Sequence, residues 1–357
     1  MRPRNLSQHA EYVAGGGIEA VASDLGCEPS EVWPLASNEN PHGPSPAVVA
    51  AVRDRADTVA AYPKAAHADL TAALADRWEV ADEQVWLGPG ADGALDYLAR
   101  ATLDPGDAVL VPAPGFAYYA MSARYCHGEV RKYHLDPDDD FEQTPAAVLD
   151  AYDGERIVYL TTPHSPTGRE FTLDGIATIA DGTDPETLVV VDEAYGEYTN
   201  RPSAVSLLDR QRADVAVTRT FSKAYGLAGL RVGYAVIPAP WADAYAKVTT
   251  PFAVNELACR AGLAALDDDE HLNESVETAR WAREYMREEL PVPTVPSGAN
   301  FVLAAVGDAP AVAAAMRERR ILIRDCSSFG LPEHVRITCG TEAGTREAVA
   351  AMREVVA

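Results

Sequence analysis

Residues 187–198, TLVVVDEAYGEY, contain a run of three valines that ends in an acidic pair, Asp192 and Glu193. A short apolar run of β-branched residues predicts a strand buried on both faces, as the strands of a parallel sheet are. Asp192 is therefore predicted to lie at the carboxyl end of a buried strand, where α/β proteins bind their ligands. A buried carboxylate at this place needs a partner, which could be a helix N-terminus, a metal ion or a protonated ring nitrogen.

Outward from this stretch, strand-like and helix-like segments alternate along the middle of the chain. Such alternation predicts βαβ units and an α/β fold, with a mostly parallel sheet covered by helices on both faces. Seven strands are predicted for this sheet, at 84–88, 107–111, 129–134, 156–161, 187–191, 214–218 and 231–237. Helices are predicted between most of them, at 91–103, 116–126, 144–151 and 172–181.

A smaller α+β domain is predicted to follow. After a long, charged helical stretch at 253–290, interrupted by the acids at 267–269, strands are expected near 299–305, 321–324 and 334–338, and helices near 308–319 and 342–355. The first 45 residues look irregular, with GGG at 15–17 and three prolines between 41 and 46. We therefore expect a large domain at 46–250 and a small domain formed by 1–45 and 251–357, whose N-terminal segment acts as a lid.

The composition is that of an acidic chain with few lysines. The sequence has 54 acidic and 30 basic residues, a net charge of −24, and four lysines. This charge argues against nucleic acid and anionic membranes as partners. No apolar run reaches membrane-spanning length, and no secretory signal is visible. Five scattered cysteines without a CxxC pair favour a reducing cytoplasm.

The excess of acidic residues also suggests that the stability of the protein depends on the salt concentration. At about 1 M salt the Debye length is roughly 3 Å, so self-repulsion is screened. We interpret the composition as an adaptation to a salty cytoplasm; the alternative is an ordinary acidic protein.

The segment TRTFSKAYGLAGLRVG, residues 218–233, keeps one of the four lysines among residues that can bind phosphate. Thr220, Ser222 and Arg231 could each bond a phosphate group, and Lys223 lies between them. The alternative is a surface lysine in a loop. Because this chain otherwise uses arginine, a retained lysine indicates a role for a neutral amine, such as formation of a Schiff base.

Pyridoxal phosphate is the cofactor that these features predict together, with Asp192 facing its ring nitrogen. GPGADG at 88–93 matches the GxGxxG pattern, but the next strand offers no acid for the ribose of a dinucleotide. The amides of Ala91 and Asp92, at the start of a predicted helix, could still bind a phosphate. No metal site is predicted, since no histidine stands at useful spacing from Asp192.

Four motifs, taken in order, resemble those of the fold-type I aminotransferases and, among these, the family of histidinol-phosphate aminotransferases: LASNENPHGPSP, PHSPTG, VVVDEAYGEY and TFSKAYGLAGLRVGY. The resemblance covers nearly the whole chain, from AEYVAGGGIEAV to VRITCGT. It implies a homodimeric, pyridoxal 5′-phosphate-dependent enzyme of histidine biosynthesis. Such an enzyme interconverts L-histidinol phosphate and 2-oxoglutarate with imidazole acetol phosphate and L-glutamate.

The resemblance also implies roles for individual cofactor-binding residues. Lys223 matches the lysine that forms the Schiff base, Asp192 the partner of the ring nitrogen, and Tyr195 the donor to the phenolic oxygen O3′. Phe116 stands where the family has a tyrosine stacked on the cofactor ring. The positions that match the phosphate site are Ala91, Asp92, Thr220, Ser222 and Arg231.

Four further positions match residues that touch the substrate or the neighbouring subunit. Tyr62 matches a tyrosine that reaches the neighbouring subunit's cofactor phosphate, and Tyr12 lies in the segment that closes over substrate. Arg336 matches the arginine that grips the amino-acid carboxylate, and Arg324 one associated with the substrate phosphate. Planar, bidentate recognition of such anions suits arginine on physical grounds.

One motif departs from the family pattern. The family has NPTG, whose asparagine donates to O3′, whereas this chain has HSPTG, with Ser165 in the place of the asparagine. Serine is shorter, so we expect Ser165 to reach O3′ only through a water and Tyr195 to be the main direct donor. Whether His164 takes over the asparagine's task stays open.

Two other functions stay open as well. IRDCSSFGLP resembles the equivalent stretch of threonine-phosphate decarboxylases, which use the same cofactor. A non-catalytic regulator that binds pyridoxal phosphate is the other alternative, although no basic segment for nucleic acid is present and both Lys223 and Asp192 are retained.

Overall fold

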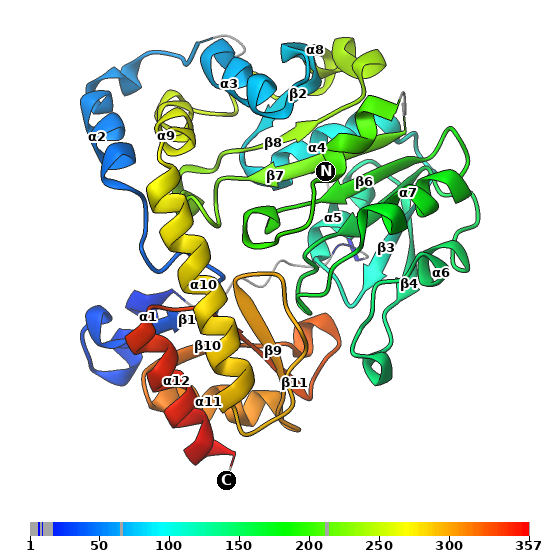
Figure 1. The fold of residues 1–357 in the computed structure, drawn as a ribbon. Coiled ribbons are helices and arrows are strands. Elements are labelled where there is room, and N and C mark those ends of the chain that lie inside the picture. The colour runs from blue at the N-terminus through cyan, green and yellow to red at the C-terminus, as the bar shows by residue number, and fades with distance from the viewer. Residues whose placement is uncertain (1–5, 8, 10–16, 65–66, 211–213, 357) are drawn as a thin grey trace.

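Seven strands form a mixed, mostly parallel sheet in the larger part of the molecule (Figure 1). The computed structural model describes residues 6–7, 9, 17–64, 67–210 and 214–356. The strands are β2 Val85–Gly88, β3 Ala108–Ala113, β4 Glu129–His134, β5 Ile157–Thr161, β6 Leu188–Asp192, β7 Val215–Thr220 and β8 Gly233–Val236. Their order is β2-β8-β7-β6-β5-β3-β4, and β8 alone runs antiparallel to its neighbours. The predicted α/β fold and all seven of its strands are confirmed.

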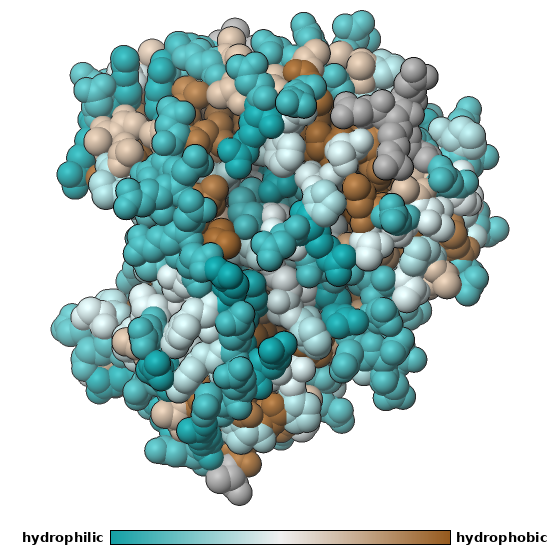
Figure 2. Space-filling view, viewed as in Figure 1, coloured by the Kyte–Doolittle hydropathy of each residue, from teal (hydrophilic) through white to brown (hydrophobic). Residues whose placement is uncertain are grey.

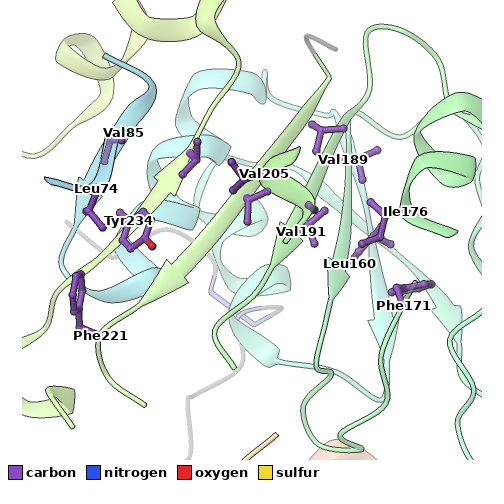
Figure 3. Packing of buried hydrophobic residues seen from close by; sticks show 14 of the residues in the cluster. Leu74, Val85, Leu160, Phe171, Ile176, Val189, Val191, Val205, Phe221 and Tyr234 are labelled. Carbon is purple, nitrogen blue, oxygen red and sulfur yellow. The ribbon is translucent and has the colours of Figure 1, made fainter. Parts of the chain in front are cut away.

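Helices bury both faces of this sheet, as the valine run of β6 predicts. Successive strand residues point to opposite faces. Leu188 and Val190 pack in the cluster under α4 and α5, whereas Val189 and Val191 pack in the cluster that includes α7. Figure 3 shows Val189 and Val191 on the same side of the sheet as Ile176 of α7. The helices around this sheet are α4 Gly90–Thr102, α5 Ala117–Tyr125, α6 Pro145–Leu149, α7 Leu173–Gly182 and α8 Tyr245–Val248.

A second sheet of four strands forms the smaller part, in the order β1-β10-β11-β9. Strand β1 is parallel to β10, and the other two pairs are antiparallel. The strands are β1 Trp33–Leu35, β9 Phe301–Ala305, β10 Ile321–Asp325 and β11 His334–Thr338, and the helices packed with them are α10 Asp269–Glu289, α11 Ala309–Glu318 and α12 Glu342–Val355. Helix α10 runs from the large sheet's side to the small sheet (Figure 1).

The helical stretch predicted at 253–290 is two helices, α9 Glu256–Leu266 and α10. The acids at 267–269 mark the break between them. Asp268 is the N-cap of α10, and its carboxylate accepts a hydrogen bond from the backbone N–H of His271 at 3.1 Å. An acid at this position satisfies an amide that the helix leaves unpaired and favours the helix dipole.

The expectation that the first 45 residues are irregular is wrong in part. Helix α1 Ile18–Leu25 and strand β1 lie there, and α2 Pro46–Asp54 and α3 Ala68–Trp78 follow. Strand β1 has three residues, one of them proline, and exists because β10 pairs with it, which local sequence does not reveal. Short 3₁₀ turns lie at Pro29–Glu31, Ala56–Ala60, Asp82–Gln84, Pro137–Asp139, Gly196–Tyr198, Ala204–Arg210, Ala228–Leu230, Ala239–Ala244 and Ser327–Phe329.

The visible surface is mainly hydrophilic, as Figure 2 shows for one face. Within the described residues, none of the helices combines the length and the apolar character that crossing a membrane would require. Many of the surface charges are paired, for example Arg317 with Asp24 at 2.7 Å, but acids remain in excess.

Thermal stability is expected to rise as KCl increases from about 0.1 M to about 1 M. The Debye length falls from about 10 Å to about 3 Å, which relieves repulsion within a chain of net charge −24. Exposed ion pairs weaken too, but each is worth at most about 1 kcal/mol. The measurement is the midpoint of thermal unfolding, with tetramethylammonium chloride at equal ionic strength as the control for effects of the potassium ion. A midpoint that is flat or falls over this range would contradict the expectation.

Candidate active site

The predicted site residues meet at the carboxyl ends of neighbouring strands. Strand β6 ends at Asp192, and β7, which runs parallel to it, pairs Thr218 with Asp192 and ends at Thr220. Parallel strands that end together expose loops at one edge of the sheet, and ligands of α/β proteins bind there. The loop after β7 carries Lys223, so the acid and the lysine that the sequence singled out lie on adjacent strand ends.

Asp192 is a buried carboxylate with neutral hydrogen-bond donors. Its Oδ2 accepts from the hydroxyl of Tyr119 at 2.7 Å, and its Oδ1 accepts from the N–H of Ala194 at 2.9 Å. Burial raises the pKa of Asp192 to about 6, although both hydrogen bonds favour the charged form. A cation brought to this carboxylate would restore its charge, so the site fits a protonated ring nitrogen.

Tyr119 is a site residue that the sequence analysis did not identify. Its ring stacks on Tyr159 at 4.7 Å between centroids, and its hydroxyl also lies 2.8 Å from Oγ1 of Thr161. Phe116, the predicted ring-stacking residue, lies one helical turn earlier and meets the Tyr119 ring edge-on at 5.5 Å. The motif PAPGFAYY contained this tyrosine at helical spacing from Phe116, which is the signal that could have found it.

The predicted phosphate-binding side chains converge near the start of α4. The Oγ atoms of Thr220 and Ser222 lie 3.0 Å apart, and the N–H of Ser222 donates to Thr220 Oγ1 at 3.1 Å. Arg231 reaches from the other side, with Nη2 3.1 Å from Oδ2 of Asp92. Hydroxyls, an arginine and the amides of a helix N-terminus together suit a phosphate.

Close packing brings strand β8 against those helix amides. A Cβ built on Gly233 would lie 2.5 Å from the backbone nitrogen of Ala91, so only glycine allows β8 to lie this close to α4. Gly90 has a φ of +78°, and a Cβ there would lie 2.6 Å from Nη2 of Arg231. The glycines therefore keep a cradle open at the helix start, and this cradle fits the phosphate of pyridoxal phosphate.

Lys223 lies partly buried beside Tyr195. Its Nζ donates to the carbonyl oxygen of Ser37 at 3.3 Å and lies 5.8 Å from the centroid of the Tyr195 ring. Asn40 holds the lysine loop, because its Nδ2 donates to the carbonyl of Ala224 at 2.8 Å. Lys223 and Tyr195 are therefore neighbours in the candidate site, which is what the resemblance implies.

The three residues that follow β1, Ala36, Ser37 and Asn38, link these groups to Arg336. The carbonyl of Ala36 accepts from Nη2 of Arg336 at 3.2 Å, and Asn38 Nδ2 donates to the hydroxyl of Tyr195 at 2.9 Å. The sequence analysis gave this segment no role, although the motif LASNENPHGPSP that contains it carried part of the resemblance.

Arg336 and Arg324 lie opposite each other on neighbouring antiparallel strands. Directly opposite residues point to the same face of a sheet. Both guanidinium carbons lie 5.7 Å from the ring centroid of Phe329, and Arg324 also donates to Ser328 Oγ at 3.1 Å. The buried Arg336 donates from Nη1 to Ser165 Oγ at 3.0 Å. Two arginines so placed can bind an anionic substrate.

Ser165, not His164, is the residue of this loop that touches the site. The His164 ring is fully buried, with Nδ1 2.8 Å from Thr167 Oγ1 and Nε2 3.1 Å from the carbonyl oxygen of Pro114. Burial lowers the pKa of His164 to about 3, so the ring is neutral. Its single N–H then donates to the carbonyl of Pro114, and the ring joins two loops rather than facing a ligand.

The structure does not bring Tyr62 into this cluster. Tyr62 is 82% exposed and stacks on Phe252 at 4.7 Å between ring centroids. Tyr12 lies outside the described residues. Over the ranges that are described, no group of three or more His, Cys, Asp or Glu side chains is arranged to hold a metal ion.

Comparisons with known proteins agree with this geometry. The family described as "Aminotransferase class I and II" matches residues 30–352. The histidinol-phosphate aminotransferase of Halorubrum lacusprofundi is 64% identical over 357 residues, which cover 100% of this chain and 98% of that protein. That of Haloarcula marismortui is 64% identical over 356 residues, 100% of this chain and 99% of the relative. The crystal structure of histidinol-phosphate aminotransferase from Sinorhizobium meliloti in complex with pyridoxal-5′-phosphate superposes with a TM-score of 0.89 at 27% identity, covering 99% of this chain and 97% of that chain.

Proposed function

The chain belongs to the class I and II aminotransferases and, within them, to the histidinol-phosphate aminotransferases, and from this membership we propose how its residues act. It is a pyridoxal 5′-phosphate-dependent transaminase. A threonine-phosphate decarboxylase and a non-catalytic regulator are set aside, because relatives 64% identical over the full chain are histidinol-phosphate aminotransferases.

The reaction that we propose moves the amino group of L-histidinol phosphate to 2-oxoglutarate, giving imidazole acetol phosphate and L-glutamate. The observation that carries the choice of substrate is the pair of arginines, Arg324 and Arg336, on one face of the small sheet. One substrate bears a phosphate and the other two carboxylates, and guanidinium groups bind both kinds of anion.

Each residue around the cofactor ring has a separate role in this proposal. When bound, pyridoxal phosphate would supply an electron sink for the α-carbon of the substrate. Asp192 would keep the ring nitrogen protonated, Tyr195 would donate to the phenolic oxygen, and Phe116 would pack on the ring. Lys223 would hold the cofactor when substrate is absent, and its freed Nζ would carry the proton between the α-carbon of the substrate and the cofactor.

The phosphate of the cofactor binds at the start of α4 in this proposal. The helix offers amides with the favourable end of its dipole, and Arg231 supplies a positive charge. The groups that hold the phosphate are the amides of Ala91 and Asp92, the hydroxyls of Thr220 and Ser222, and the guanidinium of Arg231.

We also propose a cytoplasmic homodimer. Tyr62, Phe252 and Val59 are large apolar side chains with exposures of 82%, 53% and 69%, a surface that a second subunit would cover. Tyr62 would then reach the partner subunit's cofactor phosphate. Tyr12 and its neighbours would close over the substrate.

We propose that the chain divides into a cofactor-binding part at 46–250 and a small part formed by 1–45 and 251–357. The boundary near 250 lies just after α8, although α9 packs against α2 and α3 on the large sheet's side.

A direct assay tests the activity. The purified protein is incubated with pyridoxal phosphate, histidinol phosphate and 2-oxoglutarate in concentrated KCl, and the formation of glutamate is followed. A parallel reaction with threonine phosphate is analysed for decarboxylation. Absence of glutamate in the first reaction, or turnover in the second alone, would overturn the proposed function.

Arg324→Ala is expected to lower kcat/KM for histidinol phosphate on the order of 10- to 100-fold and to change that for glutamate by less than about threefold. A hydrogen bond to a charged group is worth about 1.5–3 kcal/mol, and only histidinol phosphate carries the phosphate. The measurement is steady-state kinetics of the two half-reactions.

Arg336→Ala is expected to lower kcat/KM for both substrates, because the buried Arg336 also packs on Phe301 at 5.0 Å and bonds Ser165. The control is Arg317→Ala, which removes a partly exposed arginine of α11 that pairs with Asp24 on the surface. Equal losses for both substrates in Arg324→Ala would remove its assignment to the phosphate.

A further inference from the structure

The hydroxyl of Tyr195 accepts a hydrogen bond from a residue that the sequence analysis did not identify. Asn38 Nδ2 lies 2.9 Å from the Tyr195 hydroxyl oxygen, and the two side chains come from positions 157 residues apart. Asn38 is 1% exposed and Tyr195 is 7% exposed. Within the described part of the chain, this is the only hydrogen bond that the Tyr195 hydroxyl makes to protein.

The neighbours of Asn38 fix the direction of that bond. The backbone N–H of Asn38 donates to Oγ1 of Thr338 at 3.0 Å, so the proton of Thr338 points elsewhere. Thr338 Oγ1 in turn donates to Oδ1 of Asn38 at 3.1 Å. The Asn38 oxygen therefore faces Thr338 and the amide nitrogen faces Tyr195. An amide nitrogen only donates, so the tyrosine hydroxyl accepts here and keeps its single proton for another acceptor.

We propose that Asn38 is a positioning residue that aims the hydroxyl proton of Tyr195 at the phenolic oxygen of the bound cofactor. This inference rests on the proposed function, in which Tyr195 donates to that oxygen. A tyrosine hydroxyl can rotate, and its proton is shared among whatever acceptors surround it. A buried donor on one lone pair restricts the hydroxyl to the orientation that serves the cofactor.

The small sheet holds Asn38 in place. Asn300, next to β9, donates from Nδ2 to the backbone carbonyl of Asn38 at 3.1 Å, and Thr338 ends β11. Phe301 of β9 meets the Tyr195 ring edge-on at 5.3 Å between centroids. The backbone of Asn38 has a φ of +56°, a left-handed conformation that asparagine tolerates better than most residues. The small sheet thus sets the geometry of a hydrogen bond in the cofactor site.

The test is a pH titration of the visible absorption of the holoenzyme in molar KCl. Donation by Tyr195 stabilises negative charge on the phenolic oxygen, so losing it raises the midpoint of the titration. Tyr195→Phe is expected to raise the midpoint by about half to one pH unit, the size of one hydrogen bond. Asn38→Gly, which suits the positive φ, is expected to raise it less.

The double variant shows whether Asn38 acts by positioning the Tyr195 hydroxyl or whether its replacement merely makes the backbone of the site more flexible. In Tyr195→Phe protein, adding Asn38→Gly is expected to cause no further shift, because Asn38 acts only through the hydroxyl. Glu39→Gly controls for the extra backbone freedom, since Glu39 is exposed beside Asn38, and its midpoint is expected to equal that of the wild type. If Asn38→Gly does not fold, Asn38→Asp replaces it; its carboxylate would accept the tyrosine proton and raise the midpoint strongly.

The outcomes test the role of Asn38 separately from the role proposed for Tyr195. A midpoint unchanged in Tyr195→Phe would overturn the role proposed for Tyr195 and this inference with it. A shift in Tyr195→Phe without one in Asn38→Gly or Asn38→Asp would overturn only the inference. So would a shift from Asn38→Gly that persists in full when Tyr195 is phenylalanine.

Discussion

Lys223→Ala is expected to abolish turnover and the visible absorption of the lysine-bound cofactor while leaving the protein folded. The side chain is partly buried, and to the described residues its Nζ makes one hydrogen bond, at 3.3 Å to the carbonyl of Ser37, so little stability is lost. A positioned base alone contributes roughly 10²- to 10⁴-fold to a rate, so kcat is expected to fall by at least that factor. The measurements are the absorption spectrum of protein equilibrated with pyridoxal phosphate, steady-state turnover and circular dichroism.

Reduction of the native holoenzyme with borohydride tests independently which lysine carries the cofactor. It fixes the cofactor to the lysine that carries it, and peptide mapping is expected to find the label on Lys223. The other three lysines are internal controls: Lys64, for example, is paired with Asp69 at 2.6 Å. A label on Lys64, Lys132 or Lys247 would refute the assignment.

The large sheet could be predicted because its strands carry their signal locally. The run that precedes Asp192, residues 188–191, is buried on both faces, so each of its residues is apolar and the strand stands out in the sequence. Strand β1 gives no such signal, since it has three residues and is held by its register with β10, almost 290 positions away: Trp33 lies opposite Ile321. Pairing over that distance depends on the assembled fold rather than on local pattern.

The candidate site, like the sheets, could be predicted only where single residues carry a local signal in the sequence. Lys223 and Asp192 could be proposed from the sequence because a scarce lysine and a carboxylate at the end of a valine run are unusual by themselves. Asn38 and Tyr119 are an ordinary asparagine and an ordinary tyrosine in sequence. Their hydrogen-bond partners lie 157 and 73 residues away along the chain, and only the fold brings them within reach.

Arg219→Met is expected to destabilise the protein by about 3–5 kcal/mol, the usual cost of breaking a buried ion pair. Arg219 is the residue before the carboxyl end of β7, and its side chain is 6% exposed. Its Nη1 lies 2.6 Å from Oε2 of Glu193, and its Nη2 lies 2.8 Å from Oε1 of Glu197. Its guanidinium also stacks on Trp78 at 4.7 Å. The substitution leaves two buried carboxylates without their shared cation.

The loss is expected to depend on pH. Burial raises the pKa of Glu193 even with Arg219 beside it, and removing the arginine takes away the positive charge that opposes this shift. A carboxyl whose pKa is higher in the folded state than in the unfolded state costs stability as the pH rises through its folded value. The deficit of Arg219→Met, measured as the free energy of unfolding in urea, is therefore expected to be larger at pH 8 than at pH 5.

Two further variants show whether the charges cause the effect. Replacing both acids as well, in the triple variant Arg219→Met, Glu193→Gln and Glu197→Gln, removes the uncompensated charge and is expected to recover much of the loss. Arg317→Met, which removes a partly exposed arginine, is expected to cost less than about 1 kcal/mol. A deficit in Arg219→Met that is equal at the two pH values and persists in the triple variant would assign the effect to lost packing on Trp78. The end of β6 with Asp192, and the loop after it with Tyr195, would then be held by van der Waals contact rather than by the buried ion cluster.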